Sequence, residues 1–377
     1  MHRFHNFFSN QTTILACYLL LAVVTYLQFV SIGASSYNSF IIFREGFPHL
    51  IQHQNLHVEY PTLYYDLFLY HPAFTVFFLP FSYPPVEIGL GLWLVFSAWF
   101  IFWAIKKLPI TDEQKIFMWW FCFIEVNTSL HNVQTNTTVA GLCLLTFACL
   151  ERRHWFWAAM CAALLFCIKG YGVIVAAMFL FYPQKQKTIG YFILCLAVLS
   201  LLPLPFVGLS RWLEIYQEWY VCLQTDRKIN IGLSLMGVLD LIFPNKVNIL
   251  SIQLFGIMAL GITILRFWLG ELYQNIKNRV YLLAYLLVWV IVFNHAAESA
   301  SYIIAIVGVS LWYAFSERTL ADRILVVFVF FFSVLAPFDL YPSSWRAHFF
   351  VPFRIKAVGC IFVWLTLQFY LLKKQKI

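Results

Sequence analysis

Long apolar runs recur along the whole chain and are separated by short polar segments. Two of these runs, Ile14 to Val30 and Gly359 to Leu372, are almost continuously apolar. A run of about 18 or more such residues can cross a hydrocarbon core of roughly 30 Å as a helix, whereas strands of a membrane barrel alternate apolar and polar positions. Because lipid offers the backbone no hydrogen-bond partner, the pattern predicts an all-α integral membrane fold.

The apolar runs predict about twelve transmembrane helices, with both chain termini in the cytoplasm. We expect one multispan domain over residues 1–377, in which residues 36–87 form a long first external loop with interfacial helices. Ala73 to Tyr83 is short and bounded by prolines, so a re-entrant or interfacial helix is expected there. The spans are expected near Thr13 to Ser35, Gly89 to Ile105, Lys115 to Val126, Thr137 to Leu150, Trp155 to Ile168, Gly170 to Tyr182, Thr188 to Val207, Leu250 to Phe267, Val280 to Phe293, Ser301 to Phe315, Ile324 to Pro337 and Ala357 to Leu371.

Composition and charge support this class. Hydrophobic residues make up 62% of the 377 residues and charged residues 11%, well below the roughly 25% of charged residues that is usual in soluble domains. The net charge is +8, but the basic residues cluster between apolar runs, as at Lys106 with Lys107 and at Arg152 with Arg153. This is the positive-inside pattern, so we expect contact with membrane lipids and no nucleic-acid partner. The cysteines match no metal or disulfide spacing and are interpreted as packing residues.

Acidic and aromatic side chains gather in the expected first external loop. Glu59 and Asp66 stand there with Tyr65, Tyr70 and several histidines. A carboxylate can take a proton from an acceptor hydroxyl, and tyrosine rings stack on sugar faces. The alternative is an interfacial aromatic belt with solvated acids. The histidine run HLIQHQNLH matches no metal motif, so neither a metal nor another cofactor is expected.

Two further polar features lie between expected spans. The hairpin from Asn127 to Asn136 carries Asn132, Gln134 and Asn136, whose amides suit either hydroxyl-rich ligands or ordinary turns and caps. Lys169 separates two apolar runs. A lysine in this place predicts either an anionic phosphate partner or snorkelling to the interface.

The C-terminal half carries two more candidate sites. Asn294, His295 and Glu298 cluster at one expected external span end, where so many polar side chains favour a binding function. Arg346 and Arg354, with His348 and Lys356, form a basic group outside. Since this group opposes the positive-inside trend, it predicts an external anion such as a lipid phosphate or diphosphate.

Several familiar motifs are absent from the sequence. It contains no glycine-rich phosphate loop, dinucleotide fingerprint, HExxH motif or nucleophile elbow. A nucleotide-driven cytoplasmic enzyme is therefore disfavoured.

The order of these segments resembles glycosyltransferase family 87, and a bacterial subgroup of it in particular. The resemblance rests on the runs NSFIIFREGFPHL, VEYPTLYYDLFLYHPAF, NVQTN, CIKGYG, VIVFNHAAES and LAPFDLYP, and it extends over most of the chain. It implies a multispan enzyme of the C-type superfamily with a polyprenyl-phosphate sugar donor, an acceptor hydroxyl, and inversion at the anomeric carbon.

One position departs from the resemblance. Members of this family often carry an aspartate just after the first span, where this chain has Asn38. An amide has no useful proton affinity and cannot act as a base. Either the base comes from elsewhere, which implies an altered mechanism, or the activity is lost.

We therefore interpret the chain as a transferase of one hexose, with mannose as the candidate, from a polyprenyl-phosphate carrier to a lipid or glycan acceptor. The site is expected to face the periplasm, in a bacterial inner membrane. Asp66 is the preferred base and Glu59 the next; Lys169, Arg346 and Arg354 are assigned to the donor phosphate. The residues that we expect to bind the sugars or the acceptor are Tyr65, Tyr70, Asn132, Gln134, Asn136, Asn294, His295 and Glu298. One alternative is a transporter or flippase of a lipid-linked sugar, a class of protein that usually has charged residues in mid-span and an internal repeat. The other alternative is a noncatalytic scaffold.

Overall fold

The structure is a computed structural model, and it describes residues 8–225, 231–244, 246–336 and 341–373. Over these residues it is all-helical and contains no strand, which confirms the all-α part of the predicted fold class. Several helices begin at asparagine caps that accept a hydrogen bond from a free amide of the first turn. Asn10 accepts from the Thr12 amide at 2.8 Å and begins α2 (Gln11–Ile32), and Asn248 accepts from the Ser251 amide at 3.0 Å and begins α14 (Ile249–Leu269).

The chain divides into two compact units that are interleaved in the sequence. Unit 1 comprises Met1–Pro109 and Ser129–Lys228, and unit 2 comprises Ile110–Thr128 and Ile229–Ile377. The expectation of a single domain over the whole chain stays a prediction.

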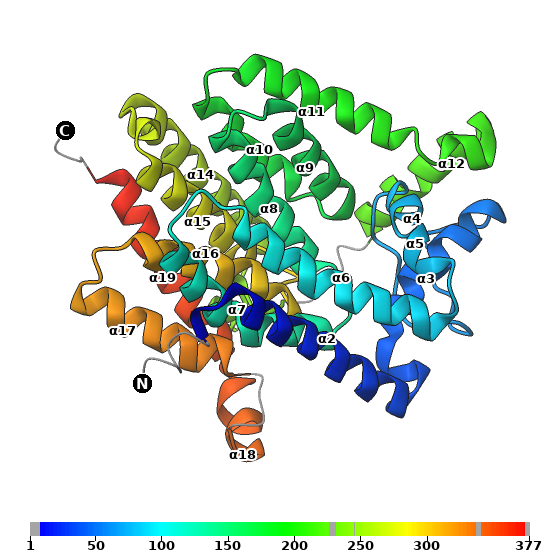
Figure 1. Ribbon diagram of the computed structural model, residues 1–377, viewed down its shortest axis with the longest axis horizontal. Helices are drawn as coiled ribbons and strands as arrows, with labels where there is room; N and C mark the ends of the chain where they lie inside the picture. The colour runs from blue at the N-terminus through cyan, green and yellow to red at the C-terminus, as the bar shows by residue number, and fades with distance from the viewer. Residues whose placement is uncertain (1–7, 226–230, 245, 337–340, 374–377) are drawn as a thin grey trace. The chain divides into compact units, whose positions relative to one another are not determined.

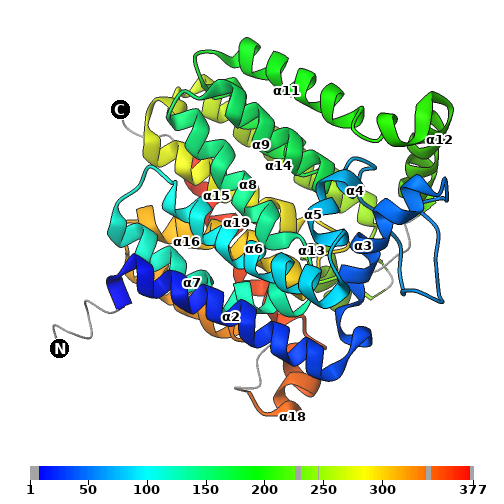
Figure 2. The same cartoon turned by 45° about the vertical axis from the view of Figure 1, so that its right-hand side comes forward.

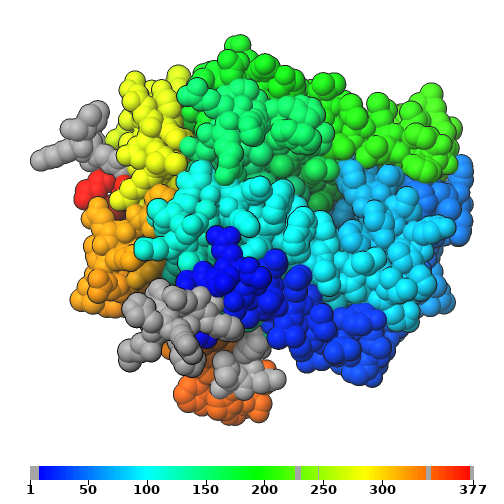
Figure 3. Space-filling view, viewed as in Figure 1, coloured from blue at the N-terminus to red at the C-terminus, as the bar shows by residue number. Residues whose placement is uncertain are grey.

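In unit 1, α2 packs on α6, α6 on α8, α8 on α9 and α9 on α11. Figures 1 and 2 both show α8, α9 and α11 lying side by side. Helix α2 forms part of the outer surface in Figure 3. Its Leu20 and Leu27 side chains are exposed, as expected of a helix that faces lipid. The helices are α2, α3 (Asn38–Ile51), α4 (Phe74–Phe77), α5 (Leu79–Ser82), α6 (Val86–Lys106), α8 (Asn136–Glu151), α9 (Trp155–Ile168), α10 (Gly172–Ala176), α11 (Lys185–Ser200) and α12 (Leu204–Thr225).

In unit 2, α15 is the central helix, because nearly all of its side chains are buried against α16 and α19. The contact with α16 is close at Gly308, where an added Cβ would lie 2.8 Å from the Ala284 carbonyl oxygen. The helices are α7 (Asp112–His131, whose last turn belongs to unit 1), α13 (Leu235–Ile242), α14, α15 (Ile276–Val292), α16 (Tyr302–Phe315), α17 (Leu320–Val329), α18 (Ser343–Trp345) and α19 (Ile355–Leu372).

The predicted count of twelve spans is not confirmed. Within the described residues, four helices are long and apolar enough to cross a membrane: α2, α6, α14 and α19. Helix α9 coincides with one predicted span, yet its 14 residues rise only about 21 Å at 1.5 Å per residue, short of a hydrocarbon core of roughly 30 Å. Segment Ala73 to Tyr83 holds two helices of four residues each, α4 and α5.

The predicted continuous span from Thr188 to Val207 is broken. Helices α11 and α12 meet there at 96°, as a broken span or a re-entrant loop. Pro203 and Pro205 lie at the break and have no amide hydrogen for a helical bond. The α11 carbonyl of Ser200 instead accepts from Trp212 Nε1 and from the Tyr216 hydroxyl, both at 2.8 Å. Side chains of α12 thus satisfy the end of α11.

An ion pair lies inside unit 2. Lys356 Nζ of α19 donates to Glu125 Oε1 of α7 at 2.8 Å and to Ser299 Oγ at 3.0 Å, and it lies 5.1 Å from the centre of the Tyr302 ring. Glu125 is fully buried. A buried charge of this kind needs its partner, since an isolated one carries a large desolvation cost.

We predict that Glu125→Met alone destabilises the protein by about 3–5 kcal/mol, because it leaves the buried Lys356 ammonium without its carboxylate. The double variant Glu125→Met with Lys356→Met removes both charges and should recover most of that loss. Thermal unfolding of the purified protein in detergent compares the two. Equal destabilisation of the single and double variants would contradict this account.

Candidate functional site

In unit 1, Asn38 holds the backbone of the first loop. Its Nδ2 donates to the Tyr65 carbonyl oxygen at 2.6 Å, and its Oδ1 accepts from the Tyr65 amide at 2.8 Å. Asn38 therefore pairs with Tyr65 as a neighbouring strand would. A carboxylate at this position could accept the second bond but could not donate the first. We call this pair of hydrogen bonds the Asn38 clamp.

Asp66 follows the clamped residue directly. Its φ is 86°, a backbone conformation that residues other than glycine rarely adopt. Its Oδ1 accepts from the Leu67 amide at 2.8 Å, and the side chain is exposed. The clamp on one side and this turn on the other hold the carboxylate in a defined place. Tyr65 and Glu59 are also exposed on the loop.

Three of the predicted residues form a hydrogen-bonded chain. Lys169 Nζ donates to Asn136 Oδ1 at 2.7 Å, and Asn136 Nδ2 donates to Gln134 Oε1 at 2.6 Å. Asn136 is fully buried at the start of α8. Lys169 is half-buried, and it caps the end of α9 with an extended backbone. The ammonium also lies 6.0 Å from the centre of the Tyr171 ring. The structure thus brings the predicted phosphate ligand to two predicted sugar ligands.

Tyr70 of the first loop contacts the hairpin that carries Gln134 and Asn136. Its hydroxyl and Thr135 Oγ1 are 3.3 Å apart, at hydrogen-bonding distance. Its ring stacks on Phe74 with 4.5 Å between centroids, and it meets Phe43 edge to face. The neighbouring Asn132 is exposed at the turn. Tyr70 is therefore packed along one side and does not present both ring faces to a ligand.

In unit 2, the loop after α15 holds the second predicted set. His295 accepts at its backbone oxygen from the Gly232 amide at 2.8 Å, and its Nδ1 lies 3.4 Å from Gln253 Nε2. Asn294 Oδ1 accepts from the Ala296 amide at 3.0 Å, and Glu298 forms a capping box with Ser301. Two of these three side chains thus make turn and cap contacts.

The basic group of unit 2 is drawn into internal contacts. Arg354 donates from Nη1 to the Gly237 carbonyl, and its Nη2 lies 3.8 Å from Asp240 Oδ2. Lys356 forms the buried ion pair with Glu125, so its charge is used inside unit 2. Arg346 begins a short π-helical turn, Arg346–Phe350.

Sequence reasoning missed Glu125 and the clamp of Asn38. Glu125 could have been found, because a single carboxylate inside the apolar run FCFIEV indicates a buried partner. The role of Asn38 gave no such signal, since its partner is a backbone group 27 residues further along the chain.

Comparison with family models supports the resemblance seen in the sequence. The model described as glycosyltransferase family 87 matches residues 68–337, more than half of the chain. The matched part includes Tyr70, the hairpin, Lys169 and the loop after α15, while Asn38 and Asp66 precede it. Comparison with curated proteins gives no match. On the extent of the family match, this integral membrane chain belongs to glycosyltransferase family 87.

Proposed function

We propose that the protein transfers one hexose, with mannose as the candidate, from a polyprenyl-phosphate carrier to a hydroxyl of a lipid or glycan acceptor at the periplasmic face of a bacterial inner membrane. Membership of the family supports a glycosyl transfer. The observation that carries the proposal is Asp66, an exposed carboxylate held directly beside the Asn38 clamp. It supplies a base near the position where the family often places its aspartate.

In the proposed step, the acceptor oxygen attacks the anomeric carbon and forms the new glycosidic bond. The bond from that carbon to the phosphate oxygen breaks, and the polyprenyl phosphate leaves with the electron pair. Asp66 takes the proton of the acceptor hydroxyl. Attack from the face opposite the phosphate inverts the anomeric carbon.

In unit 1, Lys169 is the proposed cation for the donor phosphate; in unit 2, Arg346 and Arg354 are separate candidates for binding an anionic group. A phosphate that leaves gains negative charge, and a cation positioned beforehand stabilises it. Lys169 is supported by its contact with Asn136, which places the ammonium beside two of the proposed sugar ligands. Gln134 and Asn136 are the proposed ligands of sugar hydroxyls in unit 1, and Asn294, His295 and Glu298 form a separate candidate set in unit 2.

We predict that Asp66→Asn lowers transfer at least a hundredfold while donor binding stays nearly intact. Asparagine keeps the oxygen that accepts from Leu67 and loses only the basicity. The assay incubates membranes with labelled polyprenyl-phosphate sugar and measures the glycolipid formed. Normal transfer by Asp66→Asn with loss in Glu59→Gln would move the role to Glu59, and activity in both variants would refute a carboxylate base in this loop.

The Asn38 clamp gives a second prediction. Asn38→Asp should cost about 1 kcal/mol of stability, because it replaces the donated bond with two oxygens facing each other. It should also lower transfer, although it introduces the residue common in the family. The decisive comparison is the double variant Asn38→Asp with Asp66→Asn, which should stay inactive. If the double variant transfers sugar, residue 38 can serve as the base and Asp66 is not required.

The third prediction concerns the donor phosphate. Lys169→Ala should weaken donor binding by about 1.5–3 kcal/mol through loss of a charge-assisted contact. Lys187→Ala is the matched control, since Lys187 also lies over a tyrosine, 5.8 Å from the centre of the Tyr191 ring. Titration of each purified variant with the lipid-linked donor measures the difference. Equal affinity in the two variants would leave Lys169 as a structural residue.

A further inference from the structure

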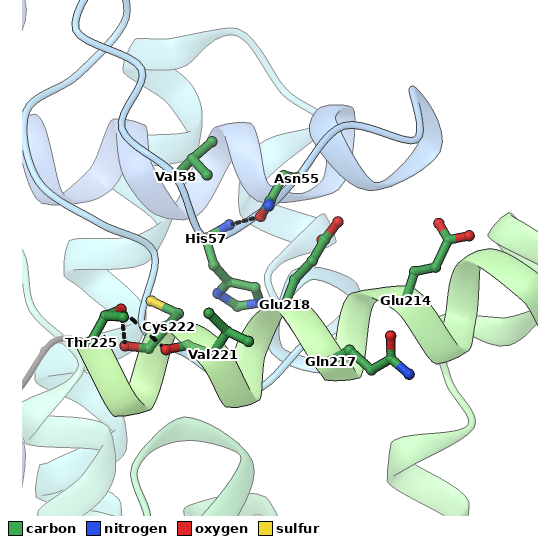
Figure 4. Close-up of a pocket in the computed structure, with 9 residues that line it drawn as sticks. All are labelled: Asn55, His57, Val58, Glu214, Gln217, Glu218, Val221, Cys222 and Thr225. Carbon is green, nitrogen blue, oxygen red and sulfur yellow. Dashed lines mark hydrogen bonds between the residues drawn. The ribbon is translucent and has the colours of Figure 1, made fainter.

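Unit 1 contains a pocket that none of the proposed catalytic or donor-binding residues lines. It lies where the segment after α3 faces α12 and has a volume of about 520 Å³ (Figure 4). Asn55 and His57 line it from the loop, and Glu214, Gln217 and Glu218 line it from α12. This volume falls within the range of about 300–1,000 Å³ seen for small-molecule sites.

His57 offers this pocket a hydrogen-bond acceptor. Its Nδ1 lies 2.6 Å from the Phe68 carbonyl oxygen, which can only accept, so Nδ1 carries the proton and Nε2 keeps its lone pair. The side chain is 5% exposed, and Nε2 is buried with no hydrogen-bond partner among the described residues. Burial lowers the pKa of His57 to about 4, so the ring is neutral at physiological pH. Figure 4 shows the ring directed toward α12.

The two glutamates are held by one arginine. Arg211 binds both oxygens of Glu218, at 2.7 and 3.0 Å, and reaches Glu214 Oε2 at 3.2 Å. Its Nη2 also donates to the Gln54 carbonyl at 2.7 Å, which joins α12 to the loop. The guanidinium offsets one of the two negative charges, and each carboxylate oxygen can accept a further bond.

These contacts define the ligand that the pocket fits. Two carboxylates repel a phosphate, and no group of three potential metal ligands occurs in the part of the chain that the structure describes. The lining is rich in acceptors, namely His57 Nε2 and the carboxylates, and it carries amides at Asn55 and Gln217 that both donate and accept. A neutral ligand with several hydroxyl groups matches this set.

We propose that this pocket binds a sugar unit of the acceptor that does not itself react. This inference rests on the proposed function, since it assigns the acceptor to the first loop and α12. Binding of a remote sugar would hold the acceptor in place, so that its energy is used to orient the reacting hydroxyl.

The test uses methyl α-mannoside as the probe and the detergent-purified full chain, with saturation-transfer NMR as the readout. Val221 lines the pocket and is 55% exposed, so Val221→Trp should fill it without disturbing the core. Leu223→Trp is the matched control, on the same helix, 45% exposed and outside the lining. We expect the wild-type protein and Leu223→Trp to give a signal and Val221→Trp to lose at least nine-tenths of it. Gln217→Ala should weaken binding threefold or more.

Transfer kinetics separate this inference from the proposed function. Val221→Trp should raise the KM for acceptor about tenfold and leave the KM for donor unchanged. If only Val221→Trp loses probe binding, the pocket assignment is supported. If the wild-type protein then transfers no sugar, the proposed function alone fails. The pocket assignment is overturned if the wild-type protein gives no probe signal, or if Val221→Trp and Leu223→Trp match in probe binding and in acceptor KM.

Discussion

The need to satisfy every backbone polar group without water is the constraint on which this structure depends. Within the membrane an unpaired amide or carbonyl costs several kcal/mol, so the chain is helical wherever it can be. The informative places are those where a helix stops. At the break between α11 and α12, Trp212 and Tyr216 both donate to the Ser200 carbonyl. At the first loop, the Asn38 amide satisfies both backbone groups of Tyr65.

The same constraint explains why the polar side chains divide into two kinds. Glu125 with Lys356, and Arg354 with Asp240, use their charges on each other, and they join helices of unit 2. In unit 1, Lys169 meets the neutral oxygen of Asn136. A cation beside a carboxylate has part of its charge offset, which makes Arg354 a weaker candidate for the donor phosphate.

For a membrane glycosyltransferase of family 87, Asn38 raises the question of where the base comes from. The family match begins at residue 68 and does not cover this part of the loop. In this loop Asn38 binds the backbone of Tyr65, and the exposed carboxylate of Asp66 follows directly in the sequence. The Asn38 amide makes two contacts with the Tyr65 backbone, and an aspartate could make only one of them.

Local hydropathy decided the class of fold and the longest helices. The runs around Ile14 to Val30 and Gly359 to Leu372 form α2 and α19, because in lipid a single long apolar run can satisfy its backbone hydrogen bonds only as a helix. The sequence also identified Gln134, Asn136 and Lys169 as candidates, since polar side chains beside apolar runs are costly without a partner. Which partner each side chain meets was decided by tertiary packing alone. Lys356 and Glu125 lie 231 positions apart, and no local pattern shows that they pair. The lengths of the short helices, the contact of Asn38 with Tyr65, and the pocket between the loop and α12 likewise depend on which segments the fold brings together.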